Sequence, residues 1–479
     1  MINEDQEEAL VNAIASNTVI DVSFLTAKEQ ADLQLASQLR REGKITTPGD
    51  PFEQSDRTEI EALQARDVFR FVTFDITHQY PDNTIMEVVK PLYGIAEAGT
   101  HWWATYFRHH REKLGMTTST YDPYLLISAG NDRTDDTDHT GDTICFGIVG
   151  MQTDDTLGLS DDAFFQREEL ELTKAGFNAK PKTRLSPTVP LIFNGCILTA
   201  NSGGMTLCQK GQSKKITTID KNTPTAQRNY VEQRARGAYV ATVCQPEASF
   251  DLSVAAQHQQ PDPEDIARLN KRLQWQRDNQ DRGLRYINLA LTTAKLFVFV
   301  DGSFANNKDL SSQIGYVIVL GNEEDNPTDN ANAFLLTGNI ITYSSTKSKR
   351  VTRSALASEL YSMVQGVDIA YAIGTTLNMI TSRLGLPKIP TVVCTDSFSL
   401  YECLVKLGTT KEKRLMIDIM ALRQSYERRE IYEIRWINGN DNLADAMTKG
   451  TPNKALETFV DRNQAVIRVE GWVKRPVNV

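Results

Sequence analysis

The sequence predicts an α/β protein of the α+β multidomain type, in which mixed sheets and helices follow one another along the chain. Its 479 residues exceed what a single hydrophobic core usually accommodates, so two or three folding units are expected. Residues 296–437 hold five short apolar runs of strand type, separated by turns or helical stretches. Residues 228–286 have mainly helical patterning. The apolar runs predict a mixed sheet with helices packed against it.

The composition is that of a globular protein without a membrane span. Hydrophobic residues make up 40% of the chain and charged residues 24%. No apolar run approaches the roughly 18 residues of a spanning helix, and the acidic start MINEDQEE is unlike a signal peptide. We therefore expect an intracellular protein, cytoplasmic or nuclear, with no membrane partner. The six cysteines are scattered without a CxxC pattern, so neither a zinc site nor a disulfide framework is predicted.

Two segments, residues 1–66 and 201–290, are predicted to be helical. In the first, Thr26 is placed as an N-cap and Gly43 closes the helix that it opens, and we expect a scaffold without chemistry. The second is expected to form helices over residues 230–242, 250–257 and 263–279.

A β-hairpin is predicted within residues 67–200. Asp154 and Asp155 are flanked by the apolar runs 144–151 and 157–159, which places both acids at the hairpin tip. Carboxylates at an exposed tip can meet a metal ion, although exposed Asp pairs in turns are common without any function.

Residues 291–455 are predicted to form the mixed five-stranded sheet, and residues 456–479 a C-terminal tail. Strands are expected over residues 296–300, 314–320, 334–343, 391–395 and 431–437. Helices are expected over residues 354–373, 397–407, 411–428 and 443–449.

Four acids in this part are candidate metal ligands: Asp301, Glu359, Asp396 and Asp445. Asp301 and Asp396 follow buried strands, whereas Glu359 and Asp445 belong to predicted helices. Each acid taken alone is more often an ordinary cap or turn former. Together they suit Mg²⁺ or Mn²⁺, because hard cations prefer oxygen ligands and a pair of such ions can stabilise both reacting oxygens of a phosphodiester.

A basic cluster precedes the helix of Glu359 and consists of Lys347, Lys349, Arg350 and Arg353. The net charge of −9 argues against a general polyanion binder, so any nucleic-acid contact has to be local. A short basic run is more often a solvated face. Its position beside the acids makes this cluster the candidate for contacts with a phosphate backbone.

Five strings around these acids resemble the ribonuclease H domain of copia-type LTR retrotransposon polyproteins. They are VDGS (300–303), IITYSSTK (340–347), ASELY (357–361), CTDS (394–397) and DNLADAMTK (441–449). Upstream, four strings resemble the palm of the reverse transcriptases of the same family, and residues 201–290 resemble its thumb and connection. The palm strings are VKPLYGI (89–95), GTHWW (99–103), YDP (121–123) and QTDDT (152–156).

The resemblance implies roles for the four acids. Asp301, Glu359 and Asp396 would hold the first Mg²⁺, and Asp301 would bridge to a second ion shared with Asp445. Asp441 competes for the last role, but the Asn-Leu-Ala-Asp string (442–445) favours Asp445. The implied substrate is an RNA/DNA hybrid. The mobile histidine that some ribonucleases H use has no counterpart, since no histidine follows His258.

The polymerase half departs from the family. A palm needs a third acid beside the pair Asp154 and Asp155, and Asp75 fits only superficially. Only 17 positions separate Asp75 from Leu92 (92 − 75), where the family has several tens of residues. Most of the fingers and the first catalytic strand are therefore missing, by deletion or by a mis-joined gene. We expect polymerase activity to be lost.

The leading hypothesis is thus a retrotransposon Pol fragment that retains a metal-dependent RNA/DNA-hybrid endonuclease joined to an inactive reverse transcriptase region. Two alternatives stay open: a non-catalytic remnant that binds nucleic acid, and an active RNA-directed DNA polymerase. Hybrid cleavage and primer extension distinguish the three.

Overall fold

The computed structural model describes residues 38, 41–42, 69–73, 84–88, 98–128, 145–152, 155–177, 181–325 and 332–473. They fall into two units, Met1–His101 and Trp102–Val479. In the first unit, β1 (Phe69–Thr73) pairs antiparallel with β2 (Thr84–Val88). The helices predicted within residues 1–66 lie almost entirely outside the described residues, and so does Asp75.

Most of helix α4 (Ala98–Leu114) belongs to the second unit, which continues with a four-stranded antiparallel sheet of order β3-β4-β5-β6. The strands are β3 (Thr117–Thr118), β4 (Leu125–Ile127), β5 (Gly147–Gln152) and β6 (Asp155–Ser160). Helix α5 (Asp162–Lys174) contributes Phe164 and Leu172 to the core that α4 and this sheet share. The predicted hairpin is β5–β6. Asp155 is exposed at the start of β6, and Asp154 lies outside the described residues.

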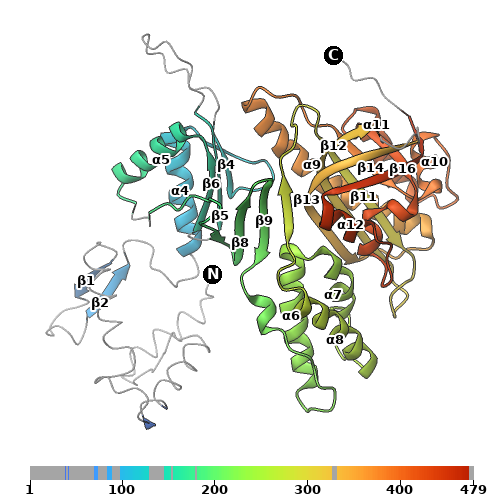
Figure 1. The fold of residues 1–479 in the computed structure, drawn as a ribbon, viewed down its shortest axis with the longest axis horizontal. Helices are drawn as coiled ribbons and strands as arrows, with labels where there is room; N and C mark the ends of the chain where they lie inside the picture. The colour runs from blue at the N-terminus through green and yellow to red at the C-terminus, as the bar shows by residue number, and fades with distance from the viewer. Residues whose placement is uncertain are drawn as a thin grey trace. The chain divides into compact units, whose positions relative to one another are not determined.

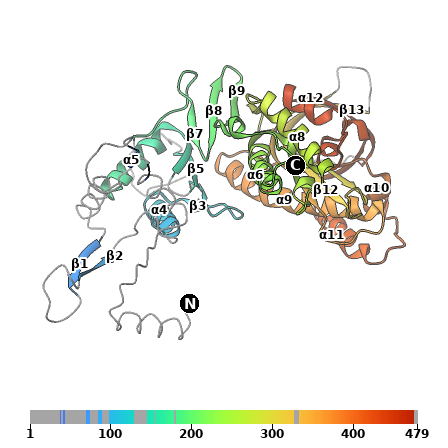
Figure 2. The ribbon, with the colours of Figure 1, turned by 90° about the horizontal axis from the view of Figure 1, so that it is seen from below.

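A second sheet has the order β10-β9-β8-β7, and Figure 2 shows β7, β8 and β9 side by side. Its strands are β7 (Leu191–Phe193), β8 (Cys196–Asn201), β9 (Gly204–Gln209) and β10 (Leu284–Ile287). Between β9 and β10 come the three predicted helices, α6 (Ala226–Cys244), α7 (Ser249–Ala255) and α8 (Pro263–Asp278). Helix α8 begins at a capping box made by Asp262 and Asp265, which satisfies its first backbone N–H groups.

The C-terminal part combines a mixed sheet with helices, as Figure 1 shows. Strand β11 (Lys295–Ser303) pairs antiparallel with β12 (Gln313–Asp325), which pairs antiparallel with β13 (Ala333–Lys347). On its other side β11 pairs parallel with β14 (Thr391–Thr395), which pairs parallel with β15 (Glu433–Ile437). The helices are α9 (Ala355–Arg383), α10 (Phe398–Val405) and α11 (Leu415–Glu427). This architecture and the sheets upstream confirm the predicted α/β multidomain fold class.

Three details differ from the prediction. The sheet has six strands rather than five, because β16 (Gln464–Trp472) pairs with both β13 and β15 and closes a barrel. The segment expected as a tail from residue 456 therefore contains β16 and nearly all of α12 (Ala455–Arg462), whose Leu456 and Phe459 are buried. The predicted helix 443–449 is a short 3₁₀ helix, η4 (Leu443–Met447).

Strand β11 is the centre of this part, because its alternate residues enter two different cores. Leu296, Val298 and Val300 pack in the core that includes α9, α10 and α11. Phe297 and Phe299 pack in the core that includes η4, α12 and β16. A strand buried on both faces is held rigidly, so Asp301 near its end has a fixed position.

Among the described residues, no helix has the length and apolarity needed to cross a membrane.

Candidate metal centre

Asp301 lies near the end of β11 and is 2% exposed. Parallel pairing aligns Val300 of β11 with Thr395, the last residue of β14, so the residues that follow them, Asp301 and Asp396, lie at the same end of the sheet. The hydroxyl of Ser362 donates to the Asp301 carbonyl at 2.6 Å, and the hydroxyl of Thr448 donates to the Asp301 carboxylate. Both its backbone and its side chain are therefore fixed.

Glu359 reaches Asp301 because α9 packs very closely on β11. A Cβ atom at Gly302 would lie 2.4 Å from the carbonyl carbon of Ser358, so only glycine permits this approach. The Ser358 hydroxyl then donates to the Gly302 carbonyl at 3.1 Å. Among the described residues, Glu359 Oε2 has no hydrogen-bond partner although it is buried. A buried carboxylate oxygen without a donor is costly unless something else binds it.

Asp396 follows β14 and is positioned by residues that the sequence reasoning did not single out. Asn442 is fully buried, and its side-chain NH2 group donates hydrogen bonds to Asp396 Oδ1 at 3.2 Å and to the Val300 carbonyl at 3.0 Å. The indole of Trp436 donates to the Asp396 carbonyl at 3.2 Å. The sequence signal for Asn442 is its place in the string DNLADAMTK, between Asp441 and Asp445.

The three acids form one group. Asp301, Glu359 and Asp396 each offer a carboxylate oxygen, and these oxygens all lie within 4.8 Å of one another. Oxygen atoms of this kind are the ligands that Mg²⁺ and Mn²⁺ prefer. The donor set and the unpartnered Glu359 oxygen fit a divalent cation.

The electrostatics of the group point the same way. Burial raises the pKa of Asp301 to about 7, and the neighbouring charge of Asp396 adds to the effect. Burial also raises the pKa of Glu359 well above its usual value, and the charges of Asp301 and Asp396 raise it further. The pKa of Asp396 is raised as well, mainly by burial. Three carboxylates are thus expensive to ionise together, and a divalent ion would relieve that cost.

Asp445, the fourth predicted acid, lies outside this group of three. It is 5% exposed, in η4, and accepts a hydrogen bond from the Asn453 backbone N–H at 2.7 Å. Its other oxygen contacts the ammonium of Lys449, which also lies 3.8 Å from Asp301 Oδ1. Burial lowers the pKa of Lys449, but the carboxylates of Asp301 and Asp445 outweigh that effect and raise it.

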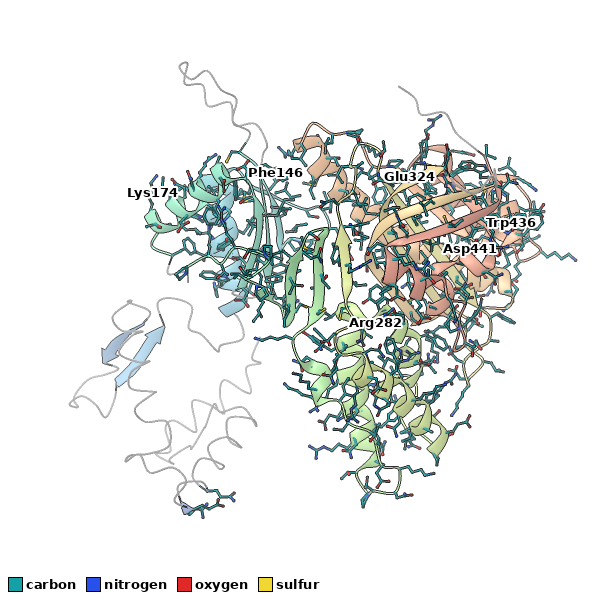
Figure 3. The ribbon with its side chains drawn as sticks, viewed as in Figure 1. Phe146, Lys174, Arg282, Glu324, Trp436 and Asp441 are labelled. Carbon is teal, nitrogen blue, oxygen red and sulfur yellow. The ribbon has the colours of Figure 1, made fainter. Side chains whose placement is uncertain are left out.

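Asp441, the competitor for the last role, is used elsewhere. Its carboxylate accepts from the Arg468 guanidinium at 2.8 Å and from the Arg468 backbone N–H at 2.9 Å, which ties it to β16. Figure 3 labels Asp441 beside the C-terminal strands. Of the two candidates, Asp445 is the one linked through Lys449 to Asp301.

The basic cluster is partly engaged. Lys347 pairs with Asp309, and the Arg350 guanidinium pairs with Asp418 at 2.8 Å while lying over the Tyr361 ring. Lys349 and Arg353 are exposed. Exposed cations keep most of their charge available for a phosphate backbone, whereas paired cations have to leave a partner first.

A comparison with protein-family models gave no match. The chain is 21% identical over 402 residues to the retrovirus-related Pol polyprotein from transposon RE1 of Arabidopsis thaliana. That alignment covers 79% of this chain and 25% of the relative, so the chain spans about a quarter of the relative's length. This chain is similar to a retroelement Pol polyprotein.

Solved structures with a likeness to the chain include RNase H1 from Halobacterium salinarum NRC-1, at 16% identity and a TM-score of 0.22, covering 34% of this chain and 98% of that one. LC11-RNase H1 in complex with an RNA/DNA hybrid is 19% identical, with a TM-score of 0.23, and 34% and 99% of the two chains are covered. The foamy viral protease-reverse transcriptase in complex with an RNA/DNA hybrid is 10% identical, with a TM-score of 0.39, and 73% and 39% are covered.

Proposed function

We propose that this chain cleaves the RNA strand of RNA/DNA hybrids endonucleolytically and with Mg²⁺, through residues 291–455, and that it derives from a copia-type Pol polyprotein. The observation that carries the proposal is the group formed by Asp301, Glu359 and Asp396, with its unpartnered Glu359 oxygen. The similarity to a retroelement Pol polyprotein supports the class of reaction. Mn²⁺ would serve in place of Mg²⁺, because both take carboxylate ligands.

Asp301, Glu359 and Asp396 would hold the ion, and Asp445 completes the proposed catalytic set. When bound, such an ion lowers the pKa of a water molecule and stabilises developing negative charge at a phosphodiester. The surrounding residues orient the ligands: Asn442 fixes Asp396, and Thr448 fixes Asp301. Rigid ligands supported by hydrogen bonds of this kind typically raise metal affinity.

The basic cluster is the proposed contact for the phosphate backbone of the hybrid. Lys349 and Arg353 carry the larger share of this role, because Lys347 and Arg350 are paired with Asp309 and Asp418. Phosphate contacts position a nucleic acid without reading its sequence. The proposed activity is therefore independent of sequence.

The reverse transcriptase region is proposed to be inactive as a polymerase. The support comes from the sequence, in which only 17 positions separate Asp75 from Leu92 (92 − 75), too few for the missing palm strand. Asp154 and Asp155 are then remnants of a metal site. Primer extension on an RNA template tests this, and templated synthesis that is lost on Asp154→Asn would contradict it.

The decisive experiment incubates the purified full chain with Mg²⁺ and a hybrid whose RNA strand is labelled. We expect internal cleavage that EDTA abolishes and that Asp396→Asn abolishes. Asp441→Asn is the matched control, because Asp441 lies in the same region but is bound to Arg468. Hybrid binding without cleavage would favour the non-catalytic remnant instead, and cleavage that survives Asp396→Asn would refute the assigned site.

A further inference from the structure

Lys449 lies where the resemblance implies a second metal ion, between Asp301 and Asp445. Its ammonium contacts Asp445 and lies 3.8 Å from Asp301 Oδ1, so one positive charge serves the two carboxylates that were expected to share a second ion. Asp445 does not belong to the group of three acids whose oxygens lie within 4.8 Å of one another. The positive charge that Asp445 faces is therefore supplied by a side chain of the protein, the ammonium of Lys449.

A simple ion pair within one turn is the plainer explanation, since Lys449 follows Asp445 by four residues. The contacts of η4 argue against a purely local brace. Asn453 N–H already binds Asp445, and the Ser345 hydroxyl donates to the Met447 carbonyl at 2.5 Å. The segment is therefore held without Lys449. The ammonium also reaches Asp301, which belongs to a different element and is a proposed ligand of the ion.

Charge balance favours the same conclusion. Asp301 and Asp445 are 2% and 5% exposed, so their charges are poorly screened by water. A divalent ion between them would have to displace or approach the ammonium of Lys449, and like charges at such short range repel strongly in a buried site. The Lys449 side chain is 42% exposed, so a phosphate can approach this side chain from solvent.

We propose that the ammonium of Lys449 takes the place of the second divalent ion. The chain then holds one ion, on Asp301, Glu359 and Asp396, while the single charge of Lys449 is shared between Asp301 and Asp445 and faces the phosphate. This inference rests on the proposed function, because it assumes that the group of three acids binds a metal. It assigns Asp445 to holding Lys449 in place of ligating an ion.

Counting bound metal tests the proposal without any cleavage assay. The full-length chain is titrated with Mn²⁺, and the free ion is followed by its electron paramagnetic resonance signal. The wild-type chain is expected to bind one ion. Lys449→Met, which removes the charge but keeps most of the length of the side chain, is expected to bind a second ion. Lys449→Arg keeps the charge and is expected to stay at one ion, and circular dichroism verifies that both variants fold.

Asp445→Asn in the Lys449→Met background identifies the second site, because loss of that carboxylate should return the count to one. Two ions in the wild-type chain would overturn the inference while leaving the proposed function standing. One ion in Lys449→Met would also overturn it, since Lys449 would not be what excludes the second ion. No ion in any variant would refute the metal site itself, and the inference with it.

Discussion

Two groups of buried ionisable side chains in this protein have opposite electrostatics. Between α4 and α5, Glu168 lies 3.0 Å from His110 Nε2, 3.1 Å from the Tyr106 hydroxyl and 2.8 Å from Lys182 Nζ. Burial opposes its ionisation, but the hydrogen bonds from His110 and Lys182 outweigh burial and lower the pKa of Glu168 to about 2. In the metal centre the pKa values of Asp301, Glu359 and Asp396 are all raised.

The direction of the pKa shift distinguishes Glu168, an acid that stabilises the fold, from the three acids that could bind a metal ion. Glu168 receives its positive charge and its donors from the chain, so it needs nothing further and is suited to holding α4 and α5 together. Glu359 keeps one buried oxygen without a partner among the described residues, in a group of three carboxylates. Buried acids whose pKa values are raised by one another in this way are candidates for a functional site.

The largest expected effect is at Asp301. Asp301→Asn should lower the rate of hybrid cleavage on the order of 10³-fold, because a ligand of the ion that stabilises the transition state is lost. The same change should leave the protein equally stable or more stable in EDTA, since it removes one of three mutually repelling buried charges. Cleavage rates and thermal unfolding in EDTA measure the two effects. If Asp301→Asn lowered stability in EDTA but left hybrid cleavage unchanged, Asp301 would be a structural acid like Glu168.

The next effect is at Glu168. Glu168→Gln should cost about 3 kcal/mol of unfolding free energy, because the ammonium of Lys182 would lose the buried carboxylate charge that balances it and His110 would lose its hydrogen bond to that carboxylate. Urea unfolding followed by tryptophan fluorescence, to which Trp102 and Trp103 beside the same core contribute, measures the cost. Glu169→Gln is the matched control, since Glu169 is the exposed neighbour on α5. Hybrid cleavage should be unchanged in both variants.

The acid stability of this part of the chain should depend on the same residue. The pKa of Glu168 in the folded protein, about 2, is below the ordinary 4.5, so its contribution is fully present above about pH 4.5. That contribution is lost as the pH falls from 4.5 toward 2. Unfolding free energies over this window should fall more steeply for the wild-type chain than for Glu168→Gln. Parallel curves would show that Glu168 is not the group responsible.

A smaller effect is expected at Gln313, which joins the helices to the metal centre. Its buried amide donates to Ser253 and Ser345, both at 2.9 Å, and Ser345 in turn donates to the Met447 carbonyl. Gln313→Ala should cost about 2 kcal/mol, because these hydroxyls lose a buried partner. It should also lower cleavage modestly by loosening η4. Gln464→Ala, at an exposed position on β16, is the control, and equal losses in both variants would contradict the positioning role.

The smallest effect is expected in the basic cluster. Arg353→Gln should weaken hybrid binding and lower the slope of log affinity against log salt by about 1, which is the signature of one lost phosphate contact. Arg350→Gln should change the slope less, because Arg350 is paired with Asp418. Fluorescence anisotropy at several salt concentrations measures both slopes. An unchanged slope for Arg353→Gln would remove the cluster from the proposed interface.

The strands and most helices of the C-terminal part were predictable because their signals are local. The apolar runs that precede Asp301 and Asp396 mark β11 and β14, and Ser354 caps α9 as a residue of its type should. Strand β16 was missed although Ile467 to Glu470 alternate between apolar and charged residues, because its pairing with β13 and β15 joins distant parts of the chain. The short η4 was taken for a full helix because its residues are good helix formers.

The sequence by itself determined which acids stand at strand ends and which strings surround them, since both are properties of neighbouring residues. Only the tertiary structure decided which acids come together. The parallel pairing of β11 with β14 brought Asp301 beside Asp396, and the glycine at position 302 admitted Glu359. Asp445 instead faces Lys449, because η4 turns its carboxylate toward an ammonium four residues on. Burial and distance set the charge of such a site, and both depend on contacts between residues far apart in the chain.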